Sequence, residues 1–248
     1  MSKVLVAGVD MVKFAKPGKQ KPYREMASTA IRGAVAEAGI DPSLIEQAYG
    51  SYIYGDSTCA QHALYDAFMT GIPVINVNNN CSSGSTAIFM ARQAVQSGAV
   101  ECALAFGFEE MQPGALGSHW DDRESPFENF LAVLNDKGYP EAPLALRCFG
   151  AAGHHYMEKY GASADLFARV AVKTRNHATL NPNALFTSEL TVDEVMAAPV
   201  LYMDYLTRLM CCPPTCGAGA AIICSDAFAL RHGIEQGVEI LGDRKSVV

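Results

Sequence analysis

Strand-like and helix-like segments alternate along the N-terminal part of the chain. Short apolar runs of strand length occupy residues 4–9, 48–54, 72–77 and 100–107. Between these runs, apolar residues recur at the spacing of an amphipathic helix in residues 23–38, 60–69 and 83–97. Because such an alternation packs helices on the faces of a sheet, it predicts an α/β fold.

The middle of the chain does not continue this alternation. Residues 111–150 contain scattered glycines, prolines and charges with few periodic apolar runs, which indicates an inserted region. Helical spacing returns at 163–179, and residues 191–194 have the pattern of a capping box at the start of another helix. A buried strand is expected at 218–224, and a further strand begins at 238. The sequence therefore predicts an insertion within a layered fold.

Composition and charge exclude several classes of protein. The chain has 248 residues, 50% hydrophobic and 18% charged, which is enough to bury a core and excludes a disordered chain. A net charge of −7 argues against binding to nucleic acid or to an anionic membrane. Residues 1–15 lack a signal-peptide pattern and no apolar run reaches 18 residues, so we expect no membrane span. We expect reduced cysteines and a cytoplasmic location, or a peroxisomal one in a eukaryote.

Residues 72–98 have the pattern of a strand that turns abruptly into a helix. An apolar run leads to three asparagines at 78–80, Cys81 follows, and residues 82–85 open the helix. The thiol of Cys81 is therefore expected near a helix N-terminus, where free N–H groups and the helix dipole favour a thiolate. Gly84 and the serines leave room for a substrate. This arrangement is typical of a nucleophile elbow, which presents a reactive atom at a strained turn.

A second interpretation of Cys81 is structural. A single cysteine in an α/β protein is more often a small buried apolar residue than a nucleophile. The asparagines before Cys81 and the glycine and serines after it are unusual for a buried position. The pattern alone therefore leaves both interpretations open.

Several segments resemble the thiolase superfamily, and within it the sterol-carrier-protein-2 (SCP-x) type of thiolase. The resemblance covers residues 4–241 and is most specific around Cys81. The segments that carry it are INVNNNCSSGSTAIFMARQ (75–93), GDSTCAQHALYD (55–66), MEKYG (157–161), DEVMA (193–197) and CCPPTCGAGAAI (211–222). The resemblance implies a fold of two βαβαβαββ halves related by pseudo-symmetry, with a loop domain inserted in the first half.

By this resemblance, the chain holds the N-terminal half of a thiolase with its loop domain. Residues 1–111 and 206–248 are expected to form the α/β core, a mixed five-stranded sheet between helices. Residues 112–205 are expected to form the inserted loop domain. Because the last residues stop within an unfinished strand and loop, we expect the chain to be truncated before the C-terminal half.

The resemblance also implies an acyltransferase of the thiolase type. Cys81 is expected to be the catalytic nucleophile, which keeps the acyl group as an acyl-enzyme when a 3-oxoacyl-CoA is cleaved, until free coenzyme A collects it. The reverse reaction condenses acyl-CoA, and both directions belong to fatty-acid or sterol side-chain metabolism. The expected partners are acyl-CoA, coenzyme A as co-substrate and a second copy of the chain, in a dimer that pairs near residues 72–78. No other cofactor is expected.

Weaker candidates for contact with coenzyme A follow from the same resemblance. Phe149 and Cys212 stand where related thiolases touch the pantetheine arm. The cations in or beside the loop region, candidates for the phosphates, are Arg123, Arg147, Lys173 and Arg175. The last two fit a solvated helix face better. Cys211, Cys212 and Cys216 supply three thiols without a fourth ligand nearby, so we expect no metal site.

One part of the thiolase machinery is not found in the sequence. Thiolases use a histidine that activates the nucleophile, and in the family it comes from a Gly-His-Pro segment of the C-terminal half. None of the six histidines of this chain stands between a glycine and a proline. The chain alone is therefore expected to be catalytically incomplete. Two alternatives stay open: a subunit of a thiolase-fold retro-aldolase, which need not keep the cysteine, and a non-catalytic partner chain.

Overall fold

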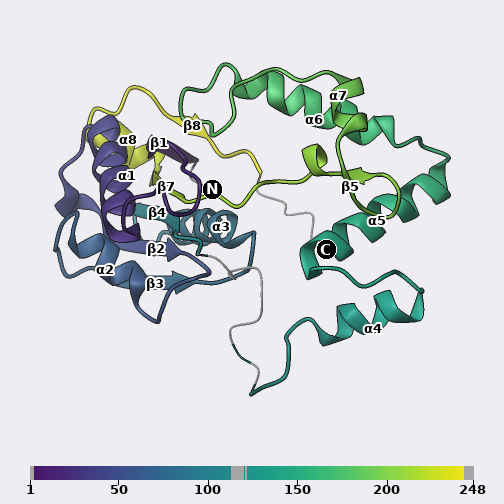
Figure 1. Ribbon diagram of the computed structural model, residues 1–248. Coiled ribbons are helices and arrows are strands. Elements are labelled where there is room, and N and C mark those ends of the chain that lie inside the picture. The colour runs from purple at the N-terminus through teal and green to yellow at the C-terminus, as the bar shows by residue number, and fades with distance from the viewer. Residues whose placement is uncertain (1–2, 113–119, 121, 243–248) are drawn as a thin grey trace. The chain divides into compact units, whose positions relative to one another are not determined.

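The chain forms two compact units (Figure 1). The computed structural model describes residues 3–112, 120 and 122–242. The first unit consists of residues 1–111 and 215–248, and the second of residues 112–214. The predicted division into an α/β core and a loop domain that ends at residue 205 stays a prediction; in the structure the second unit extends to Pro214.

A mixed sheet is the centre of the first unit. Its strands lie in the order β3-β2-β4-β7-β1-β8. β2 pairs in parallel with β3 and β4, whereas β7 pairs antiparallel with β4 and β1, and β8 antiparallel with β1. The strands are β1 (Val4–Met11), β2 (Gln47–Ser51), β3 (Val74–Val77), β4 (Cys102–Glu109), β7 (Gly217–Ser225) and β8 (Val238–Glu239). The predicted mixed α/β sheet is confirmed, and the two-residue β8 adds a sixth strand to the five expected.

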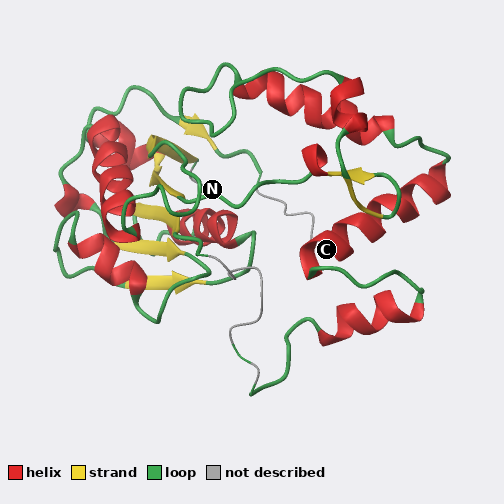
Figure 2. Cartoon of the chain, viewed as in Figure 1, coloured by secondary structure: helices red, strands yellow, loops and turns green. Residues whose placement is uncertain are grey.

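Helices cover both faces of this sheet, as Figure 2 shows. Alternate residues of a strand point to opposite faces. Leu104 and Phe106 of β4 pack in one apolar cluster with α1, whereas Ala103 and Ala105 pack in a second cluster with α3. The two helices therefore lie on opposite faces. The helices of this unit are α1 (Tyr23–Ala38), α2 (Cys59–Tyr65), α3 (Ser83–Gln96), α8 (Asp226–Arg231) and a short 3-10 helix (Pro42–Leu44).

Two predicted elements are shorter in the structure. The strand expected at 48–54 ends at Ser51, because the N–H groups of Ile53 and Tyr54 bind the carboxylate of Glu109 instead of a neighbouring strand. The N–H of Tyr52 still donates to the carbonyl of Val77 at 3.4 Å. The helix expected at 60–69 ends at Tyr65, where the N–H groups of Ala67 and Phe68 both turn back to the carbonyl of Leu64. The hydrophobic pattern of the sequence does not predict either of these hydrogen-bonding contacts.

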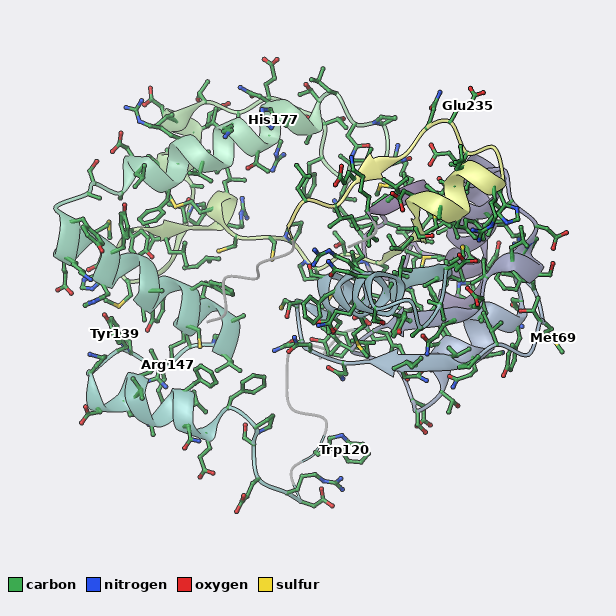
Figure 3. All side chains as sticks on the ribbon, turned by 180° about the vertical axis from the view of Figure 1, so that it is seen from behind. Met69, Trp120, Tyr139, Arg147, His177 and Glu235 are labelled. Atoms are coloured by element: carbon green, nitrogen blue, oxygen red, sulfur yellow. The ribbon has the colours of Figure 1, made fainter. Side chains whose placement is uncertain are left out.

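The second unit is mainly helical. Its elements are α4 (Glu128–Asp136), α5 (Leu144–Tyr160), α6 (Asp165–Ala178), α7 (Val192–Ala197), β5 (Val200–Tyr202), β6 (Leu206–Thr207) and a 3-10 helix (Arg208–Met210). The prediction of an irregular region over 111–150 was wrong for α4 and for the start of α5. These helices are held by a tertiary contact: the buried Arg147 donates from Nη2 to Asn135 Oδ1 at 2.6 Å and to the Tyr139 carbonyl at 2.7 Å. Figure 3 labels Arg147 and Tyr139.

The capping box predicted at 191–194 is confirmed. Thr191 Oγ1 accepts from the N–H of Glu194 at 3.2 Å, and the carboxylate of Glu194 accepts from the N–H of Thr191 at 2.7 Å. Thr191→Ala is expected to lower the free energy of unfolding by about 1 kcal/mol, because the N–H of Glu194 loses its acceptor and the Glu194 carboxylate loses the hydroxyl that orients it. Urea unfolding of the protein measures this loss. Thr191→Ser keeps the oxygen and should stay close to the wild type; equal losses in both variants would contradict the role of the cap.

Within the described ranges, none of the helices combines the length and the apolar character that crossing a membrane requires.

Candidate active site

The carboxyl ends of three parallel strands meet at one edge of the sheet. Ser51 at the end of β2 pairs with Val77, the last residue of β3, and with Gly107 near the end of β4. The segments that follow these three residues therefore leave the sheet at the same edge. In open α/β sheets this edge is where ligands bind.

Cys81 lies in the turn between β3 and α3 at this edge, and its side chain is exposed. The turn is fixed by its own hydrogen bonds: the N–H of Asn79 donates to Ser83 Oγ at 2.8 Å, and the hydroxyls of Ser82 and Ser83 donate to the carbonyls of Asn79 and Asn80 at 2.9 and 2.7 Å. Asn80 has a left-handed backbone with φ of 48°. Residues at such angles often mark strained, functional turns.

The electrostatic setting of this turn favours an anion. Cys81 precedes Ser83, the first residue of the 14-residue helix α3, so its thiol lies at the positive end of the helix dipole. The Cys81 thiol donates a long hydrogen bond to Asn80 Oδ1 at 3.9 Å. The predicted placement of Cys81 at a strand-to-helix turn is therefore confirmed, while its catalytic role stays a prediction.

A carboxylate from β4 binds the segment that follows β2. Glu109 accepts from the backbone N–H of Ile53 through Oε2 and from that of Tyr54 through Oε1, both at 3.1 Å. Burial raises the pKa of the Glu109 carboxyl, while these N–H groups act in the opposite direction. Neither Glu109 nor Tyr54 was singled out from the sequence as a site residue. The sequence signal that could have pointed to Glu109 is its position just after a predicted buried strand of the same sheet that leads to Cys81.

A second side chain holds the same segment from β3. Asn76 Oδ1 accepts from the Tyr52 hydroxyl at 3.1 Å and from the N–H of Ala60 at 3.2 Å, and Asn76 Nδ2 donates to Gln61 Oε1 at 2.7 Å. The Tyr52 hydroxyl also donates to the carbonyl of Asp56 at 2.9 Å. Residues 52–61 are thus tied to the strand that leads to Cys81.

The structure distinguishes the cysteines by their exposure. Cys59, Cys102, Cys216 and Cys224 are buried, whereas Cys81 and Cys212 are exposed. Burial raises the pKa of the Cys224 thiol to about 11, and burial together with the neighbouring Cys224 raises the pKa of Cys102 well above its usual value. Cys102 and Cys224 are therefore poor nucleophiles, because the thiolate is the reactive form.

This contrast predicts the pattern of thiol labelling in the native protein. Iodoacetamide at neutral pH should modify Cys81 and Cys212 at least about 100-fold faster than Cys102 and Cys224, because the buried thiols lack both access and thiolate character. Peptide mass spectrometry after timed quenching measures each rate. Labelling after unfolding in urea provides the control, in which the difference should largely disappear. Fast labelling of Cys102 in the folded protein would contradict its burial.

The other predicted contacts lie in the second unit. Phe149 on α5 is 71% exposed and Cys212 is exposed, so both side chains are accessible, and their contact with coenzyme A stays a prediction. Arg147 was wrongly included among the candidate phosphate partners, since it is 4% exposed and binds Asn135 and the Tyr139 carbonyl. Arg123 pairs with Asp122. Across the described residues, no group of three or more His, Cys, Asp or Glu side chains is arranged to hold a metal ion.

Fold and turn together define a class: an α/β protein that presents an exposed thiol at the start of a helix, at the carboxyl edge of a mixed sheet. Comparison with models of known protein families identifies the family of the chain. The family model described as "Thiolase, N-terminal domain" matches residues 4–198. The chain belongs to this family.

Individual proteins with similar sequences or folds support the assignment to this family. The chain is 47% identical over 246 residues to sterol carrier protein 2 of Oryctolagus cuniculus, an alignment that covers 97% of this chain and 45% of the relative. The chain spans about half the length of such curated relatives. Among solved structures, it resembles an "Ltp2-ChsH2(DUF35) aldolase" with a TM-score of 0.73 and 22% identity, over 92% of this chain and 57% of that one. Human mitochondrial 3-ketoacyl-CoA thiolase in complex with CoA gives a TM-score of 0.67 and 16% identity, over 94% and 67%. These two likenesses concern the fold.

Proposed function

We propose that this chain is the nucleophile-bearing part of a thiolase-type acyltransferase that acts on acyl-CoA. The observation that carries the proposal is the exposed Cys81 thiol at the start of α3, in a chain that belongs to the thiolase family. The likeness to sterol carrier protein 2 supports a lipid-derived acyl group, from a fatty acid or a sterol side chain.

The proposed reaction is the thiolysis of a 3-oxoacyl-CoA. The Cys81 thiolate attacks the 3-oxo carbonyl carbon and forms a C–S bond. The bond between Cα and Cβ then breaks, and its electron pair stays on Cα, which takes up a proton to give acetyl-CoA. The thiol of a second coenzyme A attacks the acyl-enzyme, loses its proton and releases Cys81 as a thiolate. The reverse sequence condenses two acyl-CoA molecules.

The residues of this chain supply the first part of that sequence. The α3 N-terminus favours the negative charge on sulfur, and the fixed turn from Asn79 to Ser83 holds the thiol in place. In the thiolase family these proton transfers use a histidine of a Gly-His-Pro segment, which none of the histidines of this chain matches, and we propose that another segment or subunit supplies it. Phe149 and Cys212 are the proposed contacts of the pantetheine arm.

A homodimer is part of the same proposal. β3 is an edge strand of the sheet, and it leads directly to Cys81. An open edge offers unpaired N–H and C=O groups to a second strand. Pairing of two copies along β3 would place both Cys81 turns near the subunit contact.

The test is direct detection of the acyl-enzyme. The protein is mixed with a 3-oxoacyl-CoA, quenched in acid and digested, and the peptide that contains Cys81 is weighed. We expect the mass of the acyl group on Cys81 and its loss after coenzyme A is added, with no acyl group on the exposed Cys212. Substrate cleavage without any acyl group on Cys81 would overturn the proposal. Release of an aldehyde or ketone from a hydroxyacyl-CoA, without acylation, would favour the retro-aldolase alternative.

A further inference from the structure

The order of the strands places one segment between Cys81 and a half-buried carboxylate. Cys81 follows β3 and Glu109 ends β4, while β2 lies between these two strands. The residues that follow β2, Ile53 and Tyr54, therefore leave the sheet between the nucleophile turn and Glu109. All three strands run in parallel, so the three segments share one edge.

Glu109 holds this segment by its backbone. Its two carboxylate oxygens each accept one N–H, from Ile53 and from Tyr54, at 3.1 Å. A carboxylate that accepts two adjacent N–H groups fixes the local backbone more firmly than a neutral acceptor does, because charge-assisted hydrogen bonds are stronger. The segment has no strand partner at these positions, since β2 ends at Ser51.

Tyr54 and Cys81 lie just beyond the same end of two neighbouring strands: Tyr54 follows Ser51, the last residue of β2, Cys81 follows Val77, the last residue of β3, and Ser51 pairs with Val77. Burial raises the pKa of the Tyr54 hydroxyl, and the negative charges of Glu109 and of Cys81 raise it further. Tyr54 is therefore a neutral phenol at physiological pH. A neutral phenol can donate its proton in a hydrogen bond to a thiolate without transferring it.

We propose that Glu109 is a positioning residue of the Cys81 site, which fixes the Tyr54 hydroxyl beside the Cys81 thiol through the backbone of Ile53 and Tyr54. Tyr54 donates a hydrogen bond to the thiolate and holds it in the orientation for attack. The acylation measurement rests on the proposed function. The placement of Tyr54 beside Cys81 is tested independently of it, by alkylation of Cys81 without acyl-CoA.

The chain offers a matched control for this role. Glu110 is the next residue, is also half-buried and also accepts a backbone N–H, from Tyr23 at 2.8 Å. Its partner lies at the start of α1 and not in the segment beside Cys81. Glu109→Gln and Glu110→Gln therefore remove the same charge and the same kind of contact, from two different backbone segments.

The experiment compares Glu109→Gln, Glu110→Gln and Tyr54→Phe with the wild type by two rates. The first is the rate constant of Cys81 acylation by acyl-CoA, and the second is alkylation of Cys81 by iodoacetamide across a range of pH. We expect acylation to slow at least about 10-fold in Glu109→Gln, because a misplaced group near the reacting atoms costs this much or more. Glu110→Gln should stay within about twofold of the wild type. Tyr54→Phe should slow alkylation at neutral pH about threefold and move the midpoint of its pH profile upward, because the thiolate loses a donor.

Three results would overturn the inference: acylation within about twofold of the wild type in Glu109→Gln, equal slowing in Glu110→Gln, or an unchanged alkylation profile in Tyr54→Phe. A merely structural role would lower the melting temperature without moving that profile. If Glu109→Gln does not fold, Tyr54→Phe decides, because it keeps every backbone contact. A wild type that takes up no acyl group counts against the proposed function alone, and the alkylation profiles then decide on the inference.

Discussion

Cys81→Ala is expected to reduce acyl transfer by about 10⁴-fold or more, the scale seen when an enzyme loses its nucleophile. No other thiol can replace it in the first unit, since Cys59, Cys102, Cys216 and Cys224 are buried in that unit. The substitution removes an exposed side chain, so the free energy of unfolding should change by less than about 0.5 kcal/mol. A stopped assay of acyl-CoA consumption measures the rate, and urea unfolding measures the stability.

Ser97→Ala provides the control for this variant. Ser97 is an exposed residue at the other end of α3, where its hydroxyl donates to the carbonyl of Ala94 at 3.0 Å. It alters the same helix away from the turn, and its rate should stay within about twofold of the wild type. If Cys81→Ala kept a tenth or more of the wild-type rate, Cys81 would not be the nucleophile, and the retro-aldolase or the non-catalytic alternative would gain support.

The turn of Cys81 was predictable because its determinants are local. The strand, the asparagines, the thiol and the small residues that open α3 are consecutive in the sequence, and the hydrogen bonds that fix the turn connect residues at most four positions apart. The capping box at Thr191 and Glu194 is local in the same way. The α/β alternation was also predictable, since each element carries its own hydrophobic period.

The surroundings of Cys81 were not predictable from such patterns. Glu109 binds Ile53 and Tyr54 over 56 and 55 residues of sequence, and this contact exists only because β2 pairs with β4 in one particular register. Arg147 is likewise a surface candidate by composition, yet its contacts with Asn135 and Tyr139 bury it. Pairings between distant segments decide which polar residues end up beside the site, and a single sequence does not display them.

The packing of α1 on β1 leads to the second large expected effect, which concerns stability. Gly8 of β1 faces α1 so closely that a Cβ atom at this position would lie 2.5 Å from the backbone N of Ala38, 2.8 Å from its Cβ, and closer still to the carbonyl oxygen of Ala34. Backbone atoms of a helix cannot rotate away as a flexible side chain does, so the strand and the helix would have to separate. Gly8→Ala is therefore expected to lower the free energy of unfolding by about 3 kcal/mol.

For a unit of this size, such a loss corresponds to a fall in melting temperature of roughly 6–12 °C, which calorimetry measures directly. Gly39→Ala is the matched comparison, because Gly39 ends the same helix with a φ of 66° and has no atom within 4 Å of the added Cβ. It costs about 1 kcal/mol through backbone strain alone. A loss in Gly8→Ala no larger than that in Gly39→Ala would mean that α1 does not pack against β1 this closely. A clearly larger loss of free energy of unfolding in Gly8→Ala than in Gly39→Ala would show that Gly8 and the small residues of α1 set the distance between this helix and the sheet. The apolar core between α1 and the strands that lead to the Cys81 turn depends on that distance.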